Sequence, residues 1–190
     1  MKKTVLTFGL ISGVIMSGLM LLSFPFHEEI GFDRSMIVGY TTMVLAFLLV
    51  YFGVRSYRDN IAGGTVSFGR AFTVGALIAA LSSVCYVATW EVLYFGFKPS
   101  WTQDYIAKYQ AHTLEKARAD GESEAELAKR KADMDKLARL YQNPAINAGM
   151  TFLEPLPVAL IMALVTAGVV SRRRRGDVAA SVASGARVLT

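Results

Sequence analysis

Two carboxylates, Glu91 and Glu154, lie inside long apolar stretches of the sequence. If these stretches cross a bilayer, each charge sits where it is costly and where it usually has a pairing or functional role. Counted at ~1.5 Å per residue, Glu91 lies roughly 7 to 9 Å inside one helix end and Glu154 roughly 12 Å inside the start of the next. Two carboxylates at similar depth could meet and share a proton or hold a cation, as in a proton relay. The candidate polar membrane site therefore comprises Glu91, Glu154, Trp90, Pro155 and Pro157.

A structural role for the two carboxylates is the alternative, and the sequence favours it. Glu154 could accept hydrogen bonds from the backbone or from Tyr and Trp donors, and Glu91 could extend to the headgroup region. On an ideal helix a stripe of small residues lies nearly opposite Glu154, so the packing face and the carboxylate point apart. The stripe comprises Ala159, Ala163 and Ala167. Because neighbouring prolines disturb the helix, this phase is not fixed.

Pro155 and Pro157 are expected to open the first turns of the last apolar helix. Proline has no amide hydrogen, so the carbonyls between Thr151 and Leu153 lose their helical donors. The broken helices of transporters use such carbonyls to bind cations. A kink or a point of re-entry is the simpler outcome, and it is the one we favour.

No residue pattern indicates an enzyme, a metal site or a cofactor site. The single cysteine, Cys85, cannot form an intrachain disulfide, and His27 and His112 have no partners at ligand spacing. A glycine-containing connector has the spacing of a phosphate-binding loop, but Arg70 and Ala71 replace the required lysine and hydroxyl residue. We expect no catalytic residue, no metal and no cofactor.

Composition places the chain among membrane proteins. It has 190 residues, of which 53% are hydrophobic, and its mean hydropathy of +0.39 is too apolar for an ordinary soluble domain of this size. The formal net charge is +5, but a cluster of positive charges adjoins the last apolar run and marks topology rather than a nucleic-acid partner. The cluster comprises Arg172, Arg173, Arg174 and Arg175. We expect it to contact anionic lipid headgroups.

Hydropathy predicts an all-α, polytopic membrane protein with four transmembrane helices. Each apolar run has about the length needed to cross roughly 30 Å of hydrocarbon. The runs cover about residues 4–26, 35–54, 71–97 and 145–171. The expected parts of the chain are three helices within 1–99, a helical hairpin at 100–144, the fourth helix with its basic end at 145–175, and a disordered tail at 176–190. A cleaved signal peptide is the alternative for the first run, but no convincing small-x-small cleavage site follows it.

Two side-chain patterns predict what the helices contact. Gly9, Gly13 and Ser17 recur at four-residue spacing, the small-xxx-small pattern that lets helices approach closely, so they are expected to face another helix. An aromatic belt at the membrane interface is predicted further along the chain. Its members are Tyr86, Trp90, Tyr94 and Trp101.

Residues 100–144 mix acidic and basic side chains and predict two amphipathic helices in water. An Asp-Gly-Glu turn separates the helices. Ser123, with Glu126 three residues later, forms a capping box for the second helix. Asn143 and Pro144 end the hairpin, because the residue before proline disfavours the helical conformation.

Basic residues predict the orientation. Short loops rich in Lys and Arg lie in the cytoplasm, and every basic end of this chain falls on one side of a four-helix topology. These residues are Lys2 and Lys3, then Arg55, Arg58 and Arg70, then Arg172 to Arg175. Both termini are therefore expected in the cytoplasm, with the 100–144 hairpin on the outer side of a cell inner membrane.

Two motifs carry a family resemblance. The first runs from Tyr141-Gln142-Asn143-Pro144 to Met150-Thr151-Phe152-Leu153-Glu154-Pro155-Leu156-Pro157, and the second comprises Gly63-Gly64, Phe68-Gly69 and Ala71-Phe72. From the first helix to about Arg174, the chain resembles the bacterial domain-of-unknown-function 4199 family. The resemblance implies a small four-helix membrane protein with no established activity, and it implies no catalytic residues.

The sequence favours a non-enzymatic structural or interaction module in the membrane. Its hairpin would offer an apolar face to the membrane domain, to a partner protein or to a second copy in a homo-oligomer. This face comprises Leu127, Met134, Leu137 and Tyr141. The alternative is a small oligomeric proton- or cation-coupled channel or transporter that uses Glu91 and Glu154. The expected partners are the lipid bilayer and such a protein, and not nucleic acid.

Overall fold

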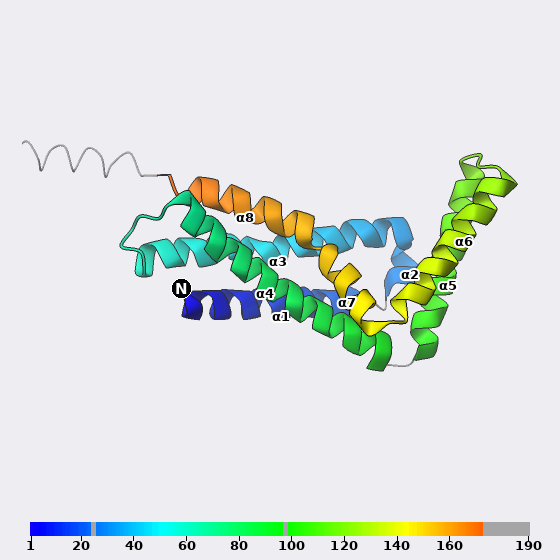
Figure 1. Ribbon diagram of the computed structural model, residues 1–190, viewed down its shortest axis with the longest axis horizontal. Coiled ribbons are helices and arrows are strands. Elements are labelled where there is room, and N and C mark those ends of the chain that lie inside the picture. The colour runs from blue at the N-terminus through cyan, green and yellow to red at the C-terminus, as the bar shows by residue number, and fades with distance from the viewer. Residues whose placement is uncertain (24–25, 97–98, 173–190) are drawn as a thin grey trace, which may run out of the picture.

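The computed structural model describes residues 1–23, 26–96 and 99–172. The all-α prediction is confirmed, since these three ranges contain helices and no strand. In chain order, the elements are α1 (Lys2–Ser23), α2 (His27–Ile30), α3 (Phe32–Asn60), α4 (Phe68–Glu91), a π-helical segment η2 (Val92–Gly96), α5 (Pro99–Ala119), α6 (Glu124–Tyr141), α7 (Pro144–Leu153) and α8 (Leu156–Val170) (Figure 1).

Four segments are long and apolar enough to cross a membrane, which is the number expected from the sequence. They are Lys2–Ser23, Phe32–Asn60, Phe68–Gly96 and Pro144–Val170. The chain is therefore a multi-pass membrane protein. The second helix continues to Asn60, because the polar residues that follow the apolar run at 35–54 are compatible with a helix once it leaves the hydrocarbon.

The four spans form an elongated bundle in which α1 and α8 both pack against α3 and α4 (Figure 1). The core contains Phe47, Val50 and Ile78, which are fully buried. Hydroxyl groups also join the helices. Ser12 Oγ donates a hydrogen bond of 2.8 Å to the carbonyl of Ala46, so α1 and α3 are linked by a polar contact as well as by packing.

Small residues of α1 face α4, as the spacing predicts. Gly9 lies so close to α4 that the hydroxyl of Ser82 donates a 3.1 Å bond to its carbonyl. A Cβ atom added to Gly13 would come within 2.6 Å of the Cβ atom of Cys85. Ser17 Oγ donates to the carbonyl of Cys85 at 3.3 Å, so the whole stripe is an interhelical contact.

Helices α5 and α6 pack against each other as a hairpin. Gly121 adopts a φ of 90° in the turn, a conformation that other residues rarely take. The capping box is present, because Ser123 accepts from the backbone of Glu126 and the Glu126 carboxylate accepts from the backbone of Ser123. The Ser123 hydroxyl also donates to Glu126 Oε2 at 2.7 Å, and the hydrogen bonds from this hydroxyl and from the Ser123 amide hold the pKa of Glu126 below its usual value. Asn143 caps α7, which begins at Pro144.

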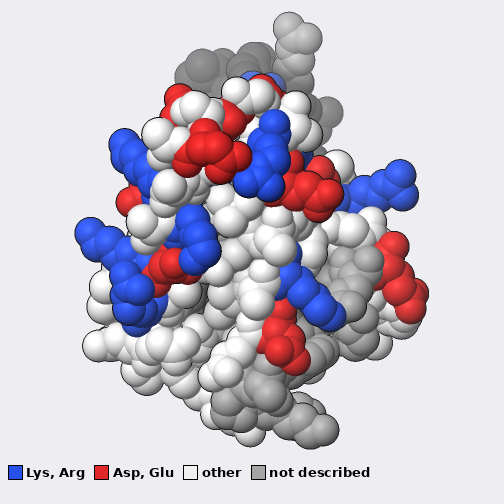
Figure 2. Space-filling model, turned by 90° about the vertical axis from the view of Figure 1, so that its right-hand side faces the viewer, with Lys and Arg blue, Asp and Glu red and all other residues white. Residues whose placement is uncertain are grey.

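The hairpin lies across one end of the bundle, which we call the hairpin-side end (Figure 1). The ring of Phe32, at the start of α3, lies 5.7 Å from that of Tyr105 and 5.6 Å from that of Tyr109. Lys116 Nζ lies 3.0 Å from Asp33 Oδ2, and this ion pair raises the pKa of Lys116. Acidic and basic side chains are interspersed over the surface seen from this end, as expected for a water-exposed face (Figure 2).

We call the opposite end of the bundle the basic end. The N-terminus, the α3–α4 connection and the end of α8 all lie there (Figure 1). Arg172 is the last residue that the structure describes. Arg173, Arg174, Arg175 and the predicted tail at 176–190 lie outside the described residues.

Candidate functional site

The fourth membrane span is broken at Glu154. Pro155 and Pro157 have no amide hydrogen, so the carbonyls of Thr151 and Leu153 lack the donors that a continuous helix would supply. Accordingly α7 ends at Leu153, Glu154 is its C-cap, and α8 begins only after Pro155. The segment predicted as one helix is therefore two helices, joined at the carboxylate.

This break removes the objection that the helical phase raised against Glu154. Ala159, Ala163 and Ala167 are buried, and α8 packs against α3 and α4. Glu154 lies before the first turn of α8, so its direction does not follow the phase of that stripe. It points instead to a cavity between the bundle and the hairpin.

This hairpin-side cavity has a volume of about 390 Å³ and is lined by side chains of α1, α3, α4, α5, α6 and α7. Glu154 is the carboxylate among them. Its aromatic walls are Phe32, Tyr40, Tyr86, Trp90, Tyr105, Tyr109 and Tyr141. Its methionine walls are Met16, Met20, Met36 and Met43. Residues that are far apart in the sequence thus enclose one amphipathic space.

A hydrogen bond from a side chain of α4 positions Glu154. The Tyr86 hydroxyl, which is largely buried, donates a 3.1 Å hydrogen bond to Glu154 Oε2. Tyr105 and Tyr141 line the same cavity from the hairpin, and burial raises the pKa of both phenols. Both hydroxyls therefore remain protonated near neutral pH and can donate hydrogen bonds.

A buried asparagine joins the hairpin to the bundle beside this carboxylate. Asn147 is fully buried in α7. Its Oδ1 atom accepts from Trp90 Nε1 at 2.9 Å and from Thr151 Oγ1 at 3.2 Å, and its Nδ2 atom donates to the carbonyl of Tyr141 at 3.1 Å. A single side chain thus connects α4, the end of α6 and α7.

Glu91 lies outside the cavity that Glu154 lines. Glu91 is the last residue of α4, directly before the π-helical segment, and its Oε1 atom is buried without a hydrogen-bond partner among the described residues. Glu154 and Trp90 line the hairpin-side cavity, whereas Glu91 does not. The two prolines also differ in burial: Pro155 is buried at the break, and Pro157 is exposed in the first turn of α8.

The predicted aromatic belt was wrong for the members that the structure can place. Tyr86 and Tyr94 are buried, and Trp90 lines the hairpin-side cavity. The hairpin covers these rings, so they face protein where lipid headgroups were expected. The side chain of Trp101 lies outside the described part of the chain.

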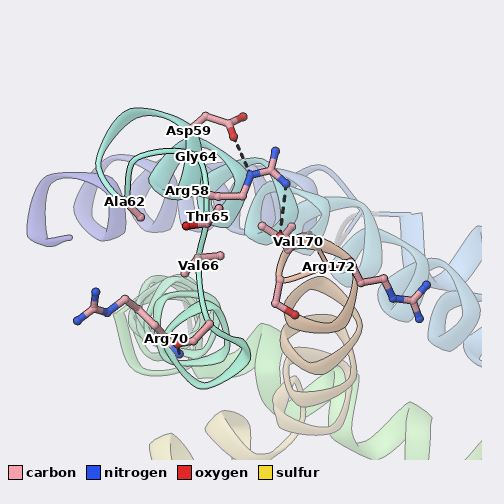
Figure 3. Close-up of a pocket in the computed structure, with 11 residues that line it drawn as sticks. Arg58, Asp59, Ala62, Gly64, Thr65, Val66, Arg70, Val170 and Arg172 are labelled. Carbon is pink, nitrogen blue, oxygen red and sulfur yellow. Dashed lines mark hydrogen bonds and ion pairs between the residues drawn. The ribbon is translucent and has the colours of Figure 1, made fainter. Parts of the chain in front are cut away.

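A second cavity, of about 580 Å³, lies at the basic end beside the α3–α4 connection. Its arginines do not converge on one point. Arg58 donates to Asp59 Oδ1 at 2.7 Å and to the carbonyl of Val170 at 3.4 Å, so it closes the C-terminus of α8 (Figure 3). Arg70 and Arg172 point to opposite sides in the same view. This arrangement gives a basic surface, and it does not build a compact anion site.

The sequence contained a signal for part of the hairpin-side cavity. Tyr86 and Trp90 are four residues apart on one helix, so they must share a face. Asn147 could have been noticed as a polar residue inside an apolar span, which requires a partner. The pairing of Tyr86 with Glu154 had no such signal, because it depends on which helices become neighbours.

Comparison with known protein families gives a match. A family model described as "Protein of unknown function (DUF4199)" matches residues 7–172, leaving out only the first six and the last eighteen residues. No curated protein and no solved structure matches the chain.

Proposed function

We propose that this chain, which belongs to the DUF4199 family of proteins of unknown function, is a non-enzymatic interaction module of the cell inner membrane. It captures a ligand between its membrane bundle and its outer hairpin. The observation that carries the proposal is the hairpin-side cavity, where aromatic walls from both parts surround the Glu154 carboxylate. Small-molecule sites have this form, being mostly apolar with a few polar groups that fix orientation.

In this proposal the hairpin takes part in ligand binding, because it forms one wall of the cavity. Tyr105, Tyr109 and Tyr141 reach the cavity from the hairpin, and the ion pair between Lys116 and Asp33 fastens α5 to the start of α3. Part of the apolar face that was expected to meet the membrane domain or a partner is used within the chain. Leu127 is buried, and Tyr141 lines the cavity.

The proposed orientation places the basic end in the cytoplasm and the hairpin outside the cell. It is supported by the basic residues of the α3–α4 connection and of the end of α8, which lie together with the N-terminus (Figure 1). The hairpin-side cavity then lies at the outer interface of the membrane. In this position Arg172 and the three arginines after it contact the anionic lipids of the inner leaflet.

Cysteine labelling tests the orientation. In a Cys85→Ser background, Glu124→Cys in the hairpin is expected to react with a membrane-impermeant maleimide in intact cells from which any outer membrane has been removed. Thr65→Cys in the α3–α4 connection is expected to react only after the inner membrane is opened. Both positions are exposed, so access to the reagent decides the result. The reverse pattern would overturn the proposed orientation.

Filling the cavity tests the proposed function. Gly39 lines the cavity, and a Cβ atom added there would meet nothing within 4 Å. Gly39→Phe is therefore expected to fold normally and to occupy part of the cavity. Mass spectrometry of the protein extracted in mild detergent should find a retained small molecule or lipid with the wild-type protein, and at least about tenfold less of it with Gly39→Phe, because about 1.4 kcal/mol of lost binding is sufficient.

Gly18→Phe is the matched control for this test. Gly18 lies on α1 outside the cavity, and its added Cβ atom also meets nothing within 4 Å. It should retain the wild-type content of bound molecules. Equal content in the wild type and in both variants would refute ligand capture in this cavity.

The channel or transporter alternative required Glu91 and Glu154 to act together. Among the described residues only Glu154 of these two lines the hairpin-side cavity, and no hydrogen bond joins the pair. We therefore keep ligand capture as the proposed function.

A further inference from the structure

We propose that the hairpin-side cavity binds the ammonium group of an organic cation, with Glu154 as the counter-ion. This inference rests on the proposed function, since it names the chemical class of the captured ligand. The group can belong to a free ammonium compound or to the headgroup of an amine-bearing lipid.

The charges of the cavity select a cation. Glu154 is the carboxylate that lines it, and the described lining residues include no lysine, arginine or histidine. The Tyr86 hydroxyl donates to the carboxylate but adds no positive charge. The carboxylate attracts a cation, and it repels an anionic ligand by the same amount.

The aromatic walls select an organic ammonium group over a metal ion. Tyr86 and Trp90 lie one turn apart on α4, and Tyr105 and Tyr109 lie one turn apart on α5. Rings that surround a carboxylate are the usual means of binding quaternary ammonium groups, through cation–π attraction. Inorganic cations require several oxygen or nitrogen ligands, and no group of three His, Cys, Asp or Glu side chains that could hold a metal ion occurs in the described part of the chain.

The methionines and the size of the cavity fit the rest of such a ligand. Met16 and Met43 are buried at its wall, where flexible thioether side chains adapt to methyl and methylene groups. The volume of about 390 Å³ falls within the range of about 300–1,000 Å³ that small-molecule sites occupy. Tyr40 and Tyr109, at its rim, remain 44% and 41% exposed, so the cavity is open to a ligand.

Tryptophan fluorescence of the full-length protein provides the test. The chain has two tryptophans, and a Trp101→Phe background leaves Trp90, which lines the cavity, as the reporter. In nanodiscs made of anionic phosphatidylglycerol, choline is expected to change the Trp90 emission saturably. The uncharged isostere of choline, in which carbon replaces the nitrogen, should bind at least about tenfold more weakly, because it forms neither the ion pair nor the cation–π contact.

Two glutamine variants locate the counter-ion. Glu154→Gln keeps the shape of the side chain and should weaken choline binding at least about tenfold. Glu91→Gln makes the same change at a membrane carboxylate outside the cavity and should leave the affinity unchanged. If Glu154→Gln does not fold, the comparison of choline with its isostere on the wild-type cavity decides the question by itself.

A lipid arm separates the two sources of the ammonium group. Nanodiscs that contain phosphatidylethanolamine should weaken choline binding if the lipid headgroup is the natural occupant, and should leave it unchanged if the ligand is a free ammonium compound. Both results support the proposal.

Other outcomes overturn the inference. If the isostere binds as tightly as choline, or Glu154→Gln binds choline normally, the ligand is not recognised as an ammonium group. If choline does not bind and wild-type protein still retains a molecule that Gly39→Phe loses, the inference fails and ligand capture stands. If neither effect is seen, both fail.

Discussion

Replacing Gly13 with alanine is expected to be among the most destabilising single changes in the bundle. The added Cβ atom would lie 2.6 Å from the Cβ atom and 2.7 Å from the Sγ atom of Cys85. The Cβ atom of Cys85 is fixed to the backbone of α4 and cannot rotate away, so α1 and α4 must separate. Overpacking of this kind costs about 1–3 kcal/mol. We expect a clear fall in the thermal unfolding temperature of the detergent-solubilised protein.

The same helix supplies the control. An added Cβ atom at Gly18 meets nothing within 4 Å, so Gly18→Ala should leave the unfolding temperature unchanged or raise it slightly. The double variant Gly13→Ala, Cys85→Gly removes both clashing atoms and should recover part of the lost stability, which would identify the pair as the cause. Equal unfolding temperatures for Gly13→Ala and Gly18→Ala would show that α1 does not pack on α4 in this way.

This contact belongs to the part of the fold that the sequence could predict. The spacing of Gly9, Gly13 and Ser17 marks one face of a helix, and in lipid a face of small residues is used for close approach. The capping box at Ser123 and the helix start at Pro144 were predictable for a related reason. Each is decided by residues within three or four positions, so distant parts of the chain cannot change it.

The direction in which Glu154 points could not be predicted from the residues near it in the sequence. Counting residues gave Glu91 and Glu154 similar depths, but depth along a helix does not determine the side to which a residue points. The partner that Glu154 reaches is Tyr86, five residues before Glu91 on α4. The break at Pro155 also interrupts the helical phase, so Ala159 and its stripe gave no guide to the carboxylate.

The cavity itself depends on tertiary structure. Its walls come from six helices, and the prediction of two amphipathic helices in water did not say that they would lie across the end of the bundle. Aromatic residues near the end of a membrane helix fit an interfacial belt by composition. Once the hairpin covers them, the same residues form a binding surface. Burial of Tyr94 follows from that cover, which the composition of α4 and η2 alone could not reveal.

Asn147→Leu is expected to loosen the hairpin from the bundle. Leucine has nearly the same volume, but it cannot accept from Trp90 Nε1 or donate to the carbonyl of Tyr141. The hydroxyl of Thr151 can turn to its own helix and loses little. Each polar group left without this partner costs about 1–3 kcal/mol, so for the two groups we expect a total of roughly 2–6 kcal/mol. The thermal unfolding temperature should fall accordingly.

Hydrogen exchange distinguishes local loosening from general destabilisation. Because the Asn147 side chain connects α6 and α7 to α4, amide exchange in Asn147→Leu should rise in α6 and α7 more than in the α1–α4 contact. Asn60→Leu is the control, since Asn60 is exposed at the other end of the bundle and donates only to Ser56 Oγ among the described contacts. It should change neither measurement. Unchanged exchange in α6 would mean that the aromatic and ionic contacts of α5 with Phe32 and Asp33 hold the hairpin without Asn147. The wall of the cavity would then depend on α3, and Asn147 would serve only the local structure of α7.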